Sequence, residues 1–157
     1  MFPALRPLLN KGGAGRYISR QESAERLLPI ADRHLDLMRT YNAVLAALPD
    51  GPARERVEAM MPYLRTEAAK VSETILSLGG TPPSGAGAGP LATAPGRTDR
   101  DHVRALLDAE TDFGNALRAE VDSVHHQERT RAILGHNADA SDSRLGLLRA
   151  VAADLAR

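Results

Sequence analysis

The chain has 157 residues, with 20 acidic and 20 basic side chains that give a formal net charge of zero. A chain of this length forms one ordinary domain, and its neutrality argues against a nucleic-acid or anionic-membrane partner. It has no cysteine, which excludes disulfides, thiolate metal ligands and a cysteine nucleophile. Aromatic residues make up only 3%, so the core has to be aliphatic, which favours helices over sheets.

An irregular arm is predicted over the first 18 residues, because two prolines and the Gly12-Gly13 pair would interrupt a helix or strand there. They lack the apolar stretch of a signal peptide. No window of the chain approaches the ~20 apolar residues that a membrane-spanning helix needs. We therefore expect a cytoplasmic protein.

A first helix is predicted over residues 20–48. Ser19 stands three residues before Glu22, which is the spacing of a capping box. Apolar residues then recur at helical spacing, and we expect them to face the core: Leu27, Ala31, Leu35, Met38, Tyr41, Leu45 and Leu48. The helix ends at the sequence Pro-Asp-Gly-Pro, a tight turn into the next helix.

A second helix is predicted over residues 52–78, antiparallel to the first. Its apolar stripe includes Leu64, Val71 and Ile75. Pro62 lies inside it and removes one backbone hydrogen bond, so we expect a bend there. The Gly79-Gly80 pair ends the helix by supplying a left-handed cap.

The segment 79–98 is rich in glycine, proline and alanine and is unusually long for a loop in a compact domain. One interpretation is a flexible linker between two independent helical hairpins. The other is a crossover along one bundle. A helix of ~28 residues is ~42 Å long, and an extended segment of this length reaches ~60 Å, so the crossover is feasible.

A third helix over residues 99–125 begins with a capping box of Thr98 and Asp101. A short turn is predicted around His125 to Arg129, followed by a fourth helix over residues 129–156. No strand-like alternation competes with these helices. The chain therefore predicts an all-α four-helix bundle over residues 19–157, made of two helical hairpins.

Two stretches carry a resemblance to a known family. "ILSLGGTPP" follows a helical hairpin, and "LLDAETDFGNALRAEVDSV" forms the third predicted helix. Both resemble ferritin-like four-helix bundles, and the third helix is similar to that of the ferritin-like family of unknown function called DUF2383. The resemblance implies a metal site with a glutamate on the first and third helices and a Glu-x-x-His pair on the second and fourth.

This chain departs from that ligand pattern, because none of the six ligand positions unambiguously keeps the family's residue. The corresponding positions hold His34, Leu64, Glu67, Phe113 or Glu110, Asn137 and Ala140. The familiar di-iron site needs several carboxylates projecting into one core. We therefore do not expect that site here.

Each predicted helix nevertheless places one polar residue near its apolar seam: His34, Glu67, Glu110 and Asn137. One interpretation is a buried hydrogen-bonded layer that fixes the helix register, with His34 contacting Glu67 or Glu110. A second is a divergent mononuclear site of His34, Glu67 and Glu110, whose donors suit Zn, Mn or Fe. A third is that one or more of these residues reaches solvent.

The remaining histidines are weaker candidates. His102 and His136 lie beside their apolar stripes and are expected at the surface, and His125-His126 is expected in an exposed turn. The function that fits best is a non-enzymatic structural or binding protein, expected to be a homodimer, without a cofactor. The alternatives are a metal-dependent oxidase or metal-storage protein and a helical-hairpin interaction module.

Overall fold

The computed structural model describes residues 16–85, 91 and 96–157. Over these residues it has two short strands and five helices, and most of the chain is helical. Their bounds are β1 Arg16–Tyr17, α2 Arg20–Ala47, α3 Pro52–Glu58, α4 Met61–Ser77, α5 Asp99–Ser123, β2 Val124–His125 and α6 Glu128–Leu155.

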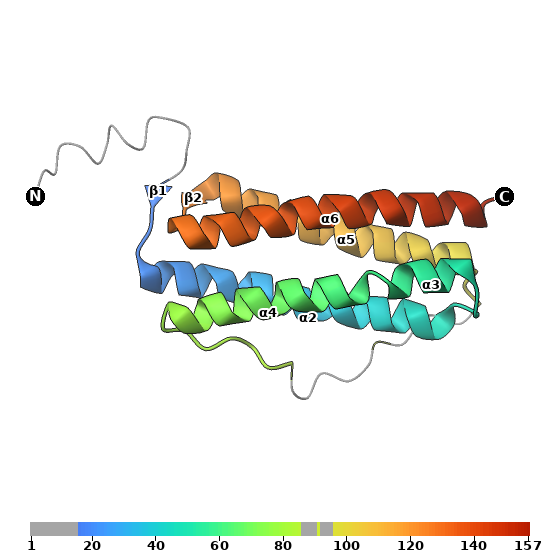
Figure 1. Ribbon diagram of the computed structural model, residues 1–157, viewed down its shortest axis with the longest axis horizontal. Helices are drawn as coiled ribbons and strands as arrows, with labels where there is room; N and C mark the ends of the chain where they lie inside the picture. Colours follow the sequence, from blue (N-terminus) through green and yellow to red (C-terminus); the bar gives the residue numbers. More distant parts are fainter. Residues whose placement is uncertain (1–15, 86–90, 92–95) are drawn as a thin grey trace, which may run out of the picture.

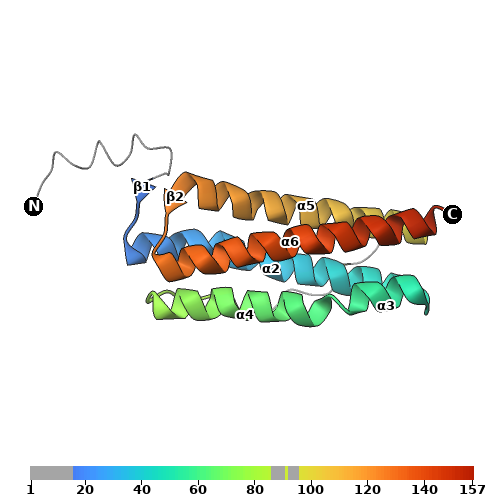
Figure 2. The same cartoon turned by 45° about the horizontal axis from the view of Figure 1, so that its top comes forward.

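The helices form an elongated all-α bundle of four rods, in which α3 and α4 together make the second rod (Figure 1). α2 packs against both α4 and α5, and α5 packs closely against α6. α4 ends at one end of the bundle and α5 begins at the other (Figure 2). α4 and α5 therefore run parallel to each other, and α2 and α5 run antiparallel.

The second rod differs from the single bent helix expected over residues 52–78. α3 ends at Glu58 and α4 begins at Met61, so the helix is interrupted just before Pro62. A proline ring clashes with the carbonyl four residues earlier, and here that residue is Glu58. At the second position of a new helix the missing N–H of Pro62 costs nothing, because that N–H would lack an intrahelical partner anyway.

The predicted helix caps are present. The Ser19 hydroxyl accepts a hydrogen bond from the backbone N–H of Glu22 at 3.1 Å. Thr98 and Asp101 form a reciprocal capping box. Gly79 has a φ of 91°, in the left-handed region where a side chain would be strained, and Gly80 donates to the Ile75 carbonyl. These caps define where α2 and α5 begin and where α4 ends.

The expected arm over residues 1–18 falls mostly outside the described residues. Its last part differs from the prediction, because Arg16–Tyr17 pairs in parallel with Val124–His125. The Tyr17 and His125 rings stack at a centroid distance of 4.7 Å. In place of the turn expected around residues 125–129, the chain forms β2, then the two residues His126 and Gln127, and then α6. No helix within the described ranges is long and apolar enough to cross a membrane.

Four residues of the stripe expected on α2 are buried, Leu27, Ala31, Tyr41 and Leu48, but the buried face differs at the other three positions. Leu35, Met38 and Leu45 are only half buried, and the buried positions are one residue away from them. The observed stripe repeats every three or four residues: Leu27, Ile30, His34, Leu37, Tyr41, Val44 and Leu48. His34 therefore lies on the centre line of the core-facing surface.

Candidate functional site

Arg144 of α6 lies at the centre of the bundle between two carboxylates. Its Nη1 donates to both oxygens of Glu67 on α4, at 2.9 and 2.7 Å. Its Nε and Nη2 donate to Oε1 of Glu110 on α5, at 3.0 and 2.8 Å. The three side chains are 5%, 6% and 0% exposed. Of these two buried ion pairs, Arg144–Glu67 joins the two helical hairpins, because Glu110 and Arg144 belong to the same hairpin.

Two hydroxyl groups complete the hydrogen bonding of Glu110. Tyr41 of α2 donates to its Oε2 and Ser141 of α6 donates to its Oε1, both at 2.8 Å. Residues from α2, α4, α5 and α6 thus meet in one network. Desolvating two carboxylates is expensive, and the network offsets the cost with charge-assisted hydrogen bonds.

The electrostatics of the network follow from its burial. Burial raises the pKa of Glu67, although the charge and hydrogen bonds of Arg144 oppose this shift. Burial by itself would lower the pKa of Arg144, but the hydrogen bonds and charges of Glu110 and Glu67 outweigh it and raise the value. Burial and the neighbouring Glu110 charge raise the pKa of Tyr41. Arg144 therefore stays cationic and Tyr41 stays a neutral donor.

His34 is in the core, as the sequence predicted, but it does not bond to a carboxylate. It is 1% exposed, and within the described residues neither ring nitrogen has a hydrogen-bond partner. Its ring lies 4.5 Å from the Phe113 ring. Burial, and then the charge of Arg144, lowers the pKa of His34 to about 3. The expected contact of His34 with Glu67 or Glu110 is wrong, because the five-donor guanidinium of Arg144 holds both carboxylates instead.

The four candidate residues, His34, Glu67, Glu110 and Asn137, are all buried. Both oxygens of Glu67 bond to Arg144, and those of Glu110 bond to Arg144, Ser141 and Tyr41. In the described ranges, no three His, Cys, Asp or Glu side chains converge closely enough to hold an ion. A divalent cation would have to displace a guanidinium already in place, so these residues fit a metal poorly.

Sequence reasoning missed Arg144 and Ser141. On the last helix the sequence analysis named only Asn137 as a polar residue near the apolar seam, and it passed over the polar positions after it. A signal was present, because one unbroken three-four spacing connects the inward residues of α6: Leu134, Asn137, Ser141, Arg144, Leu148 and Val151. A strict periodicity count that ignored polarity would have found both residues.

Two other histidines differ from the expectation. His126 is 4% exposed and bonds to the Ser23 hydroxyl at 2.6 Å and to Glu120 at 2.8 Å, so it is not in an exposed turn. Glu120 also pairs with Arg26 at 2.6 Å. His102 is 6% exposed, which corrects its expected surface position. His136 is exposed, as expected.

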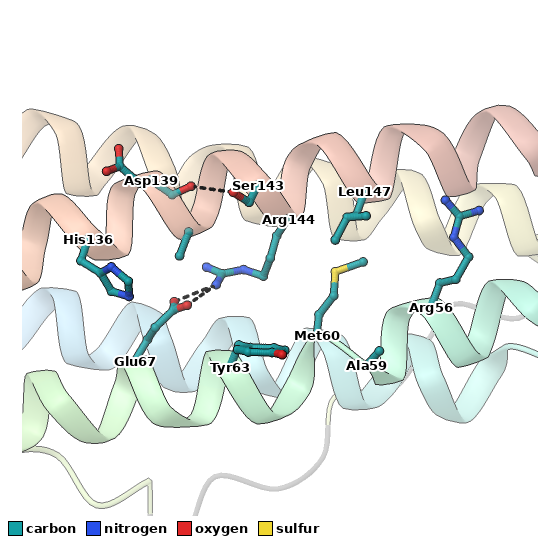
Figure 3. Close-up of a pocket in the computed structure, with 11 residues that line it drawn as sticks. Arg56, Ala59, Met60, Tyr63, Glu67, His136, Asp139, Ser143, Arg144 and Leu147 are labelled. Carbon is teal, nitrogen blue, oxygen red and sulfur yellow. Dashed lines mark hydrogen bonds and ion pairs between the residues drawn. The ribbon is translucent and has the colours of Figure 1, made fainter.

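A groove of about 560 Å³ opens between the second rod and α6, directly over the ion pair. Figure 3 shows Glu67 and Arg144 reaching toward each other across it, with Tyr63 and Met60 along the α4 side. Its apolar lining is Ala59, Met60, Tyr63, Ala140 and Leu147. We call this space the α4–α6 groove. A cavity of about 300 Å³ shares Arg56 with it, and one of about 370 Å³ shares His136.

The helix break helps to form the groove. Ala59 and Met60 lie at the step between α3 and α4, where the rod is not a continuous helix. Tyr63 is 72% exposed and Leu147 is 49% exposed, and both lie on the groove. Large apolar side chains left in solvent beside a concavity mark an interaction site more often than isolated exposed ones do.

No family model matches the chain, and no curated protein matches it.

Proposed function

We propose that this protein is a non-enzymatic binding protein with a ferritin-like bundle, in which a buried arginine replaces the metal and the α4–α6 groove holds the ligand. The observation that carries the proposal is Arg144, which bonds to Glu67 and Glu110 at once. The residues present support binding better than redox or hydrolytic chemistry.

The replacement has a simple electrostatic reason. Two carboxylates on facing helices repel each other in a low-dielectric core, and a cation between them is needed to keep both ionised. In the metal-binding bundles that the sequence resembles, metal ions take that role. Here Arg144 supplies the charge from the chain itself, and its planar fork gives directed hydrogen bonds to both partners.

The groove has the properties of a small-molecule site. Its volume of about 560 Å³ falls in the range typical of ligand pockets, which is ~300–1,000 Å³. Most of its exposed wall area is apolar, and the polar or charged residues that line it are Arg56, Glu67, His136, Asp139, Ser143 and Arg144. These features favour a ligand with an apolar body that packs between Tyr63 and Leu147.

Metal analysis tests the first part of the proposal. Protein purified without an affinity tag should contain less than stoichiometric Fe, Mn and Zn, and it should not oxidise added Fe(II) faster than buffer does. Stoichiometric metal that is lost in a Glu67→Gln, Glu110→Gln variant would establish the metal-dependent oxidase or storage protein instead.

A fluorescent apolar probe tests the second part. Anilinonaphthalene sulfonate should bind to the native protein with saturable fluorescence, and Ala140→Trp, which fills the groove, should abolish that signal. Leu76→Trp is the matched control, because Leu76 is 60% exposed and does not line the groove. Equal binding by both variants would place the probe elsewhere and rule out the groove as the site.

A further inference from the structure

The buried network at the centre of the bundle carries one more negative charge than positive charge. Glu67 and Glu110 contribute two carboxylates, and Arg144 is the guanidinium that bonds to both. Tyr41 is a neutral donor, and His34 has a pKa of about 3, so neither adds a positive charge at neutral pH. An uncompensated charge in a low-dielectric core is costly, and a cation that approaches it from outside is stabilising.

Glu67 is the place where this charge borders the α4–α6 groove. An ionised carboxylate has about four acceptor sites. Glu110 uses most of its own, because Arg144, Ser141 and Tyr41 all donate to it, and its side chain is 0% exposed. Within the described part of the chain, the Glu67 oxygens accept only from Nη1 of Arg144. Figure 3 shows the Glu67 carboxylate in the space between α4 and α6, so the groove gives a donor access to it.

The other charged groups on the groove wall do not remove this negative charge. Arg56 is paired with Asp154 at 2.7 Å. Asp139 is exposed and adds a carboxylate. His136 points toward Glu67 in Figure 3. Burial raises the pKa of Glu67, and a positive charge on His136 is one of the effects that oppose this rise, so a cation at this end of the groove favours the Glu67 carboxylate.

The Tyr63 ring is a second feature of the groove that suits a cation. Tyr63 and Glu67 are one turn apart on α4, so their side chains are neighbours on that helix. Tyr63 is 72% exposed, and Figure 3 shows its ring along the same wall of the groove. The face of an aromatic ring attracts a cation that lies within about 6 Å of the ring centre. An ammonium group bonded to Glu67 therefore has an aromatic neighbour.

We infer that the ligand of the α4–α6 groove is an organic amine in its protonated form. Its ammonium group donates to Glu67, and its apolar body packs between Tyr63 and Leu147. The inference rests on the proposed function, because it names the ligand class for the same groove. An anionic ligand would place its charge beside the excess negative charge of the network, and Arg144 could serve it only by giving up bonds to Glu67 and Glu110.

Three probes with one apolar body separate the effect of charge from that of apolar packing. Adamantylamine is a cation at neutral pH, adamantanol is neutral, and adamantane carboxylate is an anion. In calorimetric titration of the full chain, the amine should bind with 1:1 stoichiometry and at least ~10-fold more tightly than the alcohol. The carboxylate should bind more weakly than either. Equal affinities for the amine and the alcohol, or tightest binding of the carboxylate, would overturn the inference.

Glu67→Gln removes the charge and keeps the size of the side chain. It should reduce the affinity for the amine to that for the alcohol, and it should change the affinity for the alcohol by less than ~2-fold. Asp139→Asn is the matched control, because it removes a carboxylate that points away from Glu67 in Figure 3, and it should keep the preference for the amine. A helical Glu67→Gln variant that also keeps this preference would contradict the inference.

Tyr63→Leu tests the same contact on a side chain whose exposure makes its replacement tolerable for folding. It keeps an apolar group and removes the ring, so it should weaken binding of the amine at least ~2-fold more than binding of the alcohol. Tyr63→Phe keeps the ring and should retain the preference. Equal losses for both probes in Tyr63→Leu would count against the inference.

The outcomes distinguish this inference from the proposed function. Saturable binding of anilinonaphthalene sulfonate that Ala140→Trp abolishes, without a preference for the amine, would keep the groove as a binding site and overturn the ligand class alone. If neither the dye nor the amine bound in the groove, the proposed function and the inference would fail together.

Discussion

Arg144 gives Glu110 two hydrogen bonds on a single oxygen, from Nε at 3.0 Å and from Nη2 at 2.8 Å. Its remaining terminal nitrogen holds Glu67 on the opposite rod. One side chain on α6 thus satisfies carboxylates on α5 and α4.

Arg144→Met should lower the free energy of unfolding by about 3 kcal/mol or more, because it leaves two buried carboxylates without a counter-charge. Urea denaturation at neutral pH measures the loss. The triple variant with Glu67→Leu and Glu110→Gln should recover much of it, since glutamine still accepts from Tyr41 and Ser141. A loss below ~1 kcal/mol for the single variant would mean that the ion pair is not buried as described.

His34 should make stability depend on acid pH. Its pKa is about 3 in the folded protein, against 6.5 for an unperturbed histidine. Between these values the unfolded chain binds the proton more readily, so the contribution is fully present above pH 6.5 and is lost as pH falls toward 3. Integrated over the window, the loss is at most ~5 kcal/mol. The raised pKa of Glu67 acts in the opposite sense, because its protonated form is favoured in the folded state.

His34→Leu isolates the histidine contribution. It should flatten the acid limb of the stability–pH curve between pH 3 and 6.5 while leaving the Glu67 contribution in place. Because His34 bonds to neither carboxylate, this variant should keep the melting temperature at neutral pH or raise it. An acid limb identical to that of the native protein would show that His34 is solvated.

Two helical glycines provide a matched pair. A Cβ at Gly114 would lie 2.9 Å from the Ser141 hydroxyl that bonds to Glu110, whereas a Cβ at Gly135 would meet nothing within 4 Å. Gly114→Ala should therefore destabilise the protein by ~1–2 kcal/mol through crowding. Gly135→Ala should stabilise it by ~0.5–1 kcal/mol through helix propensity. Chemical denaturation of both variants checks the pair, and equal signs would contradict it.

Cutting the chain between the hairpins tests whether the long segment is a linker. A protease site inserted near Ser84 should be cleaved, and the two fragments should still elute together from gel filtration in mild denaturant. The reason is that Glu67–Arg144 and Tyr41–Glu110 both connect α2–α4 with α5–α6. The same cut in the Arg144→Met background is the control and should release the fragments more readily. Native fragments that separate in buffer would favour two independent hairpins.

Local sequence signals determined the helices and their ends. Helix caps bond to backbone groups only a few residues away in the sequence. They could therefore be predicted without tertiary information, as at Ser19, at Thr98 and at the glycine pair after α4. The sequence predicted only a bend at Pro62. Tertiary packing decides whether a helix continues with a bend at such a proline or ends and restarts as two helices. The positions of His34, Glu67, Glu110 and Asn137 near the apolar seams indicated that they could face inward, with exposure to solvent left as an alternative, and all four are buried.

Their partners could not be predicted in the same way. Which polar group meets which depends on the relative rotation and axial register of four helices, and the buried face of α2 differs from the expected stripe at three positions. A guanidinium reaches two partners on different helices only when that register is fixed. The sequence by itself therefore predicted a four-helix bundle with polar residues near its core. The tertiary structure decided that Arg144 bonds to both carboxylates, while His34 and Asn137 have no hydrogen-bond partner among the described residues.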